Sequence, residues 1–64
     1  MEKEIIAKSD VHGLKSVYLL AYTNDQKIIY VVSYGRNKIQ TVSLDVAKKQ
    51  YSNMILKQMD DKLI

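Results

Sequence analysis

The sequence predicts an α+β fold, in which a three- or four-stranded antiparallel meander is followed by one C-terminal amphipathic helix packed on one sheet face. Between residues 14 and 42, runs rich in Val, Ile, Leu and Tyr alternate with short clusters of turn formers, the pattern of consecutive strands. From residue 43 onward, apolar residues instead recur every four positions, as on one helical face. The 64 residues suffice for one such domain, residues 1–64, and not for two.

The sheet is expected to consist of short segments joined by tight turns. Residues 14–23 form one strand, which leads into turn formers centred on Asn24-Asp25, and residues 27–34 form the next. Gly35-Arg36-Asn37 then reverses the chain into residues 38–42, because Gly and Asn tolerate left-handed backbone. Residues 3–7 are interpreted as a fourth strand, although the charged start at residues 2–4 equally suits a short helix.

The C-terminal helix is expected to begin after Ser43, a favourable N-cap that places Asp45 in the first turn, where the helix dipole favours an anion. Its apolar face is defined by a four-residue spacing: Ala47, Tyr51, Ile55, Met59 and Leu63, with Leu44 and Met54 beside them. Leu56 widens this face toward the C-terminal end. That extra width indicates a contact beyond one small sheet.

Both faces of the predicted sheet are apolar. With the first turn centred on Asn24-Asp25, one face carries the opposed pairs Tyr22–Lys27, Leu20–Ile29 and Tyr18–Val31. A single helix covers only one face, so something must cover the other: the N-terminal segment, a second copy of the chain, a different protein, or a ligand that stacks on tyrosines. The sequence does not decide which side chains of residues 38–42 lie on which face of the sheet, because a two-residue and a three-residue turn at Gly35 predict opposite faces.

Composition narrows the classes of function. The chain has no Cys and a single His, His12, so neither disulfides nor a closed zinc site is expected. Its ten basic and seven acidic residues give a net charge of +3, scattered without blocks. The N-terminus lacks the apolar core of a secretory signal, and the apolar runs fall short of the roughly 20 residues that span a bilayer. A cytoplasmic protein with no membrane partner is therefore expected.

Groups that could support catalysis form no convincing constellation. Ser9, Asp10 and His12 are neighbours on one short segment, whereas catalytic triads are assembled across a fold. Asp60 and Asp61 are adjacent on the predicted helix and point about 100° apart, which is unsuited to shared acid–base work. Neither glycine lies in a phosphate-binding pattern. No enzymatic activity, cofactor or metal is expected.

The leading functional hypothesis is a small non-enzymatic binding or regulatory protein, of the kind that phages and mobile elements encode, acting through protein–protein contacts. Surplus apolar surface supports it, and a homodimer is expected because self-association is the stabilising device left to a domain this small without disulfides or metal. The candidate protein interface consists of Tyr18, Leu20, Tyr22, Ile29, Val31, Leu56, Met59 and Leu63.

The alternative hypothesis is a small nucleic-acid-binding module. Here Lys27, Arg36 and Lys38 would contact phosphates beside tyrosines that stack on bases. The tyrosines are equally explained as strand formers that pack across the sheet, and Lys rather than Arg dominates the basic residues.

Overall fold

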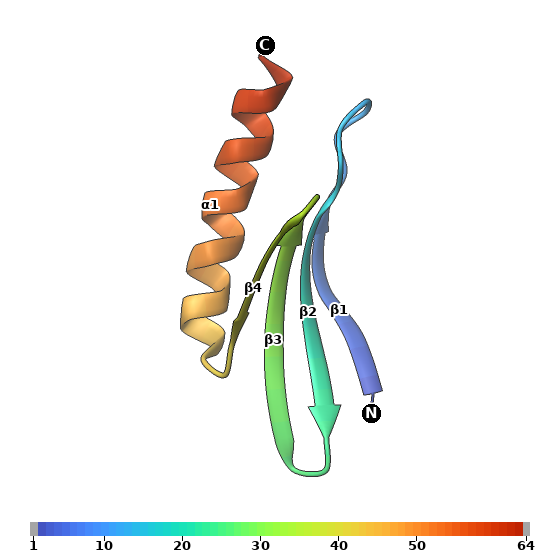
Figure 1. Ribbon diagram of the computed structural model, residues 1–64, viewed down its shortest axis with the longest axis vertical. Coiled ribbons are helices and arrows are strands. Elements are labelled where there is room, and N and C mark those ends of the chain that lie inside the picture. The colour runs from blue at the N-terminus through green and yellow to red at the C-terminus, as the bar shows by residue number, and fades with distance from the viewer. Residues whose placement is uncertain (1, 64) are drawn as a thin grey trace.

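The computed structural model describes residues 2–63, which form four strands and one helix: β1 (Glu2–Ser9), β2 (Val17–Asn24), β3 (Lys27–Tyr34), β4 (Asn37–Thr41) and α1 (Leu44–Lys62). The strands make one antiparallel sheet in the order β1-β2-β3-β4, and α1 packs against β2, β3 and β4 from one side (Figure 1). The predicted fold class is confirmed, and the N-terminal segment supplies the fourth strand.

The core lies between α1 and one side of the sheet, which we call the helix face. Leu19 of β2, Val32 of β3 and Ala47 of α1 are fully or almost fully buried at its centre. Burying a Val or Leu side chain stabilises a fold by about 1.5–3 kcal/mol. The opposite side of the sheet, which we call the open face, has no helix over it within the described residues 2–63.

Both turns between the last three strands contain two residues. Asn24 pairs with Lys27 across the Asp25-Gln26 turn, and Tyr34 pairs with Asn37 across the Gly35-Arg36 turn. The first residue of each turn is left-handed, with φ of 58° at Asp25 and 61° at Gly35. The tight second turn settles the question that the sequence left open: Lys38 and Gln40 lie on the open face.

The first turn lies one residue later than predicted, which corrects the register of β2 and β3. Tyr22 pairs with Ile29 rather than Lys27, and Leu20 pairs with Val31. The correction slides the strands by two residues, and side chains alternate with a period of two, so every residue keeps its predicted face.

A β-bulge interrupts β1. Ile5 pairs with Leu20 and Ala7 pairs with Leu19, so Ile6 is an extra residue without a partner on β2. On the N-terminal side of the bulge, the odd-numbered residues face away from the helix. On the C-terminal side, the even-numbered Lys8 does, and Ala7 faces the core.

The helix begins as predicted, with Ser43 as N-cap: its hydroxyl accepts a hydrogen bond from the Val46 N–H at 3.3 Å. Only part of the four-residue apolar stripe packs on the sheet. A helix has 3.6 residues per turn, so a strict four-residue spacing drifts by about 40° at each step. Met59 and Leu63 are therefore turned away from the sheet and are 55% and 84% exposed.

Candidate binding surface

The open face of the sheet carries an apolar centre. Cross-strand pairing aligns Ile5, Leu20 and Val31 in one row, and it places Tyr22 beside Ile29 in the next. The strand positions predicted as an interface all lie on this face: Tyr18, Leu20, Tyr22, Ile29 and Val31. These five residues therefore share one face of the sheet, on which Val31 is 8% exposed and Ile29 is 41% exposed.

Four lysines surround the apolar centre, and we call them the lysine frame: Lys3, Lys8, Lys27 and Lys38. Lys8 on β1 and Lys38 on β4 stand at the two ends of one cross-strand row. Lys3 lies on β1 two rows away, and Lys27 lies at the start of β3 one row further. Among residues 2–63, no strand position on the open face is occupied by Asp or Glu, and Glu2 and Glu4 of β1 face the other side.

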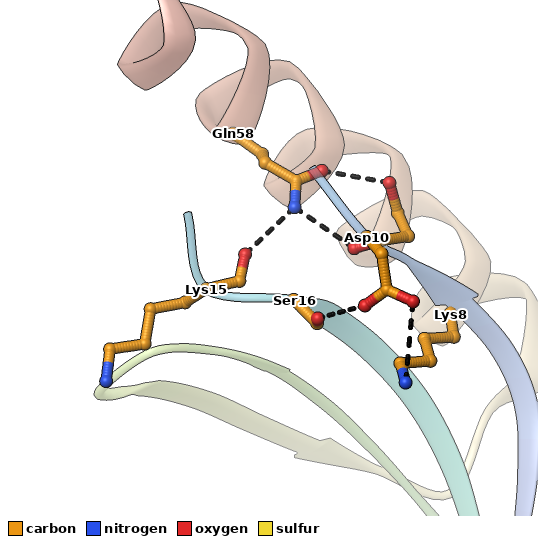
Figure 2. Close-up of polar contacts among 6 residues, drawn as sticks. Lys8, Asp10, Lys15, Ser16 and Gln58 are labelled. Carbon is orange, nitrogen blue, oxygen red and sulfur yellow. Dashed lines mark hydrogen bonds and ion pairs between the residues drawn. The ribbon is translucent and has the colours of Figure 1, made fainter. Parts of the chain in front are cut away.

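Lys8 is held by contacts with its neighbours. Its Nζ lies 5.4 Å from the centroid of the Tyr18 ring and 3.4 Å from Oδ2 of Asp10, which belongs to the loop after β1. The Asp10 carboxylate, followed by Tyr18, raises the pKa of Lys8. A hydrogen bond from the Ser16 hydroxyl lowers the pKa of Asp10 (Figure 2). The Lys8 and Asp10 side chains are 43% and 62% exposed, so these contacts orient Lys8 and contribute little to stability.

Two shallow hollows indent the open face toward the β2–β3 turn. One is lined by Tyr22, Ile29, Val31, Lys38 and Gln40. The other is lined by Tyr22, Asn24, Asp25, Gln26, Lys27 and Ile29. Because Tyr22 and Ile29 border both, the surface between Lys38 and Lys27 is continuous.

The remaining predicted interface residues lie on the opposite side of the molecule. Leu56 follows Ala47 by nine residues, which at about 100° per residue turns it half a circle away from the core. Leu56 and Met59 of α1, together with Leu63 at its C-cap, are exposed, and we call them the outer ridge. The eight residues predicted as one interface are therefore divided between two surfaces, separated by the sheet and the helix.

The three predicted nucleic-acid contacts do not cluster. Lys27 lies beside the β2–β3 turn, whereas Arg36 and Lys38 lie at the β3–β4 turn, at the other end of β3. Six residues of strand, about 20 Å, separate Lys27 from the row that contains Lys38. Lys27 and Lys38 belong to the lysine frame, and Arg36 occupies the turn beyond it.

Gln58 is a buried polar residue that the sequence analysis missed. Its side chain is 0% exposed, and its Nε2 donates to the carbonyl oxygens of Ser9 at 3.0 Å and Lys15 at 2.9 Å (Figure 2). Its Oε1 accepts from the Ser9 hydroxyl at 2.9 Å. These bonds tie both ends of the β1–β2 loop to α1. Its spacing from Ala47, Tyr51 and Met54, in steps of four and three, was the available signal for its burial.

The loop residues considered for catalysis have other partners. The Ser9 hydroxyl donates to Gln58, the Asp10 carboxylate contacts Ser16 and Lys8, and His12 is exposed on the turn. In the described part of the chain, no group of three or more His, Cys, Asp or Glu side chains could hold a metal ion.

No helix within residues 2–63 combines the length and the apolar character needed to cross a membrane. None of the protein-family models, curated proteins and solved structures compared with the chain matches it. The interpretation of the open face therefore depends on its geometry and its charges.

Proposed function

We propose that the protein is a non-enzymatic binding protein that acts through protein–protein contacts made by the open face of its sheet. The observation that carries the proposal is an apolar sheet face that no other element of residues 2–63 covers. The N-terminal segment, one of the covers that the sequence allowed, is the edge strand β1 of the same sheet, and α1 packs on the other side. An antiparallel sheet face that meets only water normally carries polar side chains.

The side chains at the centre of the open face favour a protein over a nucleic acid. Four are aliphatic and two are tyrosines: Ile5, Leu20, Ile29, Val31, Tyr18 and Tyr22. Sheets that bind single-stranded nucleic acids stack the bases on exposed aromatic rings, whereas aliphatic surface is matched by the apolar side chains of another protein. Arg36, the only arginine of the chain, lies outside the lysine frame.

Charge favours a different protein over a second copy of the chain. A dimer formed through two open faces would bring two lysine frames together, and like charges facing each other across an interface are unfavourable. The charges on this face therefore do not support the homodimer that the short chain length led us to expect. A partner that presents apolar side chains with acidic neighbours avoids the repulsion.

Adjacent isoleucines provide a matched test of this proposal. Ile28 and Ile29 are 45% and 41% exposed and lie on opposite faces of β3, so Asp substitutions at the two sites introduce the same charge at the same exposure. Wild type, Ile28→Asp and Ile29→Asp are immobilised and exposed to nuclease-treated extract of the source cells. A protein retained by wild type is then produced in pure form, and its affinity for each variant is measured by calorimetry.

We expect Ile29→Asp to weaken this affinity by at least about tenfold, because the aspartate must be desolvated in the contact, and Ile28→Asp to change it by less than about twofold. Circular dichroism establishes that both variants are folded. Equal affinities for all three proteins, or a greater loss in Ile28→Asp, would show that binding does not use the open face.

A further inference from the structure

We infer that the segment bound by the open face is an acidic amphipathic α-helix, with an apolar stripe on the central strands and carboxylates on both flanks. This inference rests on the proposed function, because it specifies the chemistry of what the open face binds. Three properties of the described residues support it: the spacing of the lysines, the sign of the charge and the size of the apolar centre.

The spacing of the lysines matches a helix. Neighbouring strands lie about 4.8 Å apart, so β1 and β4 are separated by about 14 Å across β2 and β3. An α-helix with its side chains is about 10–12 Å wide, so it fits between the lysines of β1 and Lys38 of β4. Lys3 and Lys8 pair with Tyr22 and Tyr18, which are four residues apart on β2, so they span about 13 Å along the sheet, or about two and a half helical turns.

The sign of the charge specifies acidic flanks. Lys3 and Lys8 lie on one side of the central strands and Lys38 on the other, with no Asp or Glu at an open-face strand position within residues 2–63. Lys8 lies beside the Tyr18 ring and within 3.4 Å of the Asp10 carboxylate in the adjoining loop, so Lys3 and Lys38 carry most of the argument from charge. Carboxylates spaced by three or four residues on a helix would meet these ammonium groups. Charges at the rim of an interface mainly accelerate association and make it sensitive to salt.

The size of the apolar centre suits a single helix. A rectangle of about 14 Å by 20 Å covers roughly 300 Å², whereas a protein–protein interface of standard size buries about 800 Å² on each partner. A face this small is filled by a helix of a few turns laid on β2 and β3. We therefore expect dissociation constants in the micromolar range, which corresponds to about −8 kcal/mol.

The outer ridge of α1 in a second copy is a poorer occupant. The ridge of Leu56, Met59 and Leu63 is apolar and helical, yet Lys48 and Lys49 are exposed on the same outward half of α1. Docking this ridge on the open face would set lysines against the lysine frame. A head-to-tail contact of this kind would also generate rings or filaments rather than a symmetric dimer.

Synthetic peptides test the inference directly. Three helical peptides of about 18 residues share one Leu/Ala stripe and differ only in their flanking residues, which are Glu, Gln or Lys. A short oligothymidylate is the fourth probe. Dissociation constants come from fluorescence anisotropy at low and high salt, and amide chemical shifts in two-dimensional NMR spectra locate the contact.

We expect the Glu-flanked peptide to bind the open face with micromolar affinity, the Gln-flanked peptide about tenfold more weakly, and the Lys-flanked peptide weakest of all. Lys3→Glu/Lys38→Glu should reverse this order. The control Lys49→Glu/Lys57→Glu makes the same change in net charge on exposed positions of α1, and it should leave the affinities within about twofold.

The outcomes separate this inference from the proposed function. Equal binding of the Glu- and Gln-flanked peptides, or no binding of the Glu-flanked peptide, would overturn the acidic helix. The proposed function would stand in either case if Ile29→Asp still weakened the affinity for the natural partner by at least about tenfold and Ile28→Asp changed it by less than about twofold. Tighter binding of oligothymidylate than of the Glu-flanked peptide, lost in Lys3→Glu/Lys38→Glu, would overturn both in favour of a nucleic acid.

Discussion

Replacing Gln58 by Met removes the polar contacts that join α1 to the β1–β2 loop while nearly preserving side-chain volume. Three hydrogen bonds disappear, one from the Ser9 hydroxyl at 2.9 Å and two to the carbonyl oxygens of Ser9 at 3.0 Å and Lys15 at 2.9 Å. The side chain of Gln58 is 0% exposed, so in the unchanged fold no solvent replaces them at this position.

The cost of Gln58→Met can be estimated from these three bonds. Each contributes a net stabilisation of about 1 kcal/mol, so their loss amounts to about 3 kcal/mol. Burying the apolar thioether in place of the amide is favourable and offsets part of this lost stabilisation. We therefore expect the free energy of unfolding to fall by about 2 kcal/mol. Domains of this size are stable by roughly 3–10 kcal/mol, so the effect is large.

Urea unfolding followed by circular dichroism measures this change, and hydrogen exchange of the amides in residues 10–16 reports whether the loop opens more often. Gln50→Met is the matched control, because Gln50 is half-buried on the same helix. A loss below about 0.5 kcal/mol for Gln58→Met would refute the reasoning. So would an equal loss for Gln50→Met, which would attribute the effect to the change of residue type on α1.

Two further predictions concern the ends of α1. The Tyr34 hydroxyl donates to Oδ2 of Asp61 at 2.6 Å, and this hydrogen bond, followed by burial, raises the pKa of Tyr34. The folded protein therefore holds the phenolic proton more tightly than the unfolded chain, so the stabilisation is complete below about pH 10 and is lost as the pH rises through the raised pKa. Tyr34→Phe should accordingly be less stable than wild type at pH 8 and approach it at pH 11 in urea unfolding, and a difference that does not shrink would contradict this origin. At the other end, Ser43→Ala removes the N-cap bond to the Val46 N–H and should lower the free energy of unfolding by about 1 kcal/mol, whereas Ser43→Asp should retain most of it; equal losses in both variants would argue against capping.

The fold was predictable because its two periodicities differ clearly. Alternation with a period of two, interrupted by turn formers, identifies the strands, and the faces of β2 and β3 follow from parity alone. The position of the first turn was not predictable to the residue, since Asn24, Asp25 and Gln26 form a continuous polar run and each adjacent pair could occupy a turn. The misplaced turn left the residues of β2 and β3 on their predicted faces, because it displaced the pairing of the two strands by an even number of residues.

The candidate surface was predictable on the central strands and less so elsewhere. The shared face of the five strand residues follows from the alternation of side chains along β2 and β3: Tyr18, Leu20, Tyr22, Ile29 and Val31. Leu56, Met59 and Leu63 do not lie with them. The drift of a four-residue spacing turns Met59 and Leu63 outward, and Leu56, nine residues after Ala47, lies on the side of the helix away from the core. Gln58 was overlooked because a search for apolar periodicity passes over a glutamine, even at a core position.

Membership of Lys8 in the lysine frame depends on the bulge at Ile6. With strict alternation, residues 3, 5, 7 and 9 would share one face and Lys8 would lie on the other. The extra residue reverses the parity, so that Lys3 and Lys8 both lie on the open face. Sequence alternation carries no signal for this reversal, since Ile6 is as suitable for a regular strand as its neighbours.

The bulge in β1 and the hydrogen bonds of the buried Gln58 are linked, because both depend on which way Lys3 and Ser9 face on the same strand. The Ser9 hydroxyl must reach α1 to donate to Gln58, while Lys3 of the same strand must face away from the helix to join the lysine frame. Residues 3 and 9 are an even number apart, so a regular strand could satisfy one of these conditions and never both. The bulge at Ile6 allows both, and the bonds between Gln58 and Ser9 favour the bulged register over the regular one. The polar contact in the core is therefore compatible only with the register that places Lys3 on the open face, on the far side of the sheet.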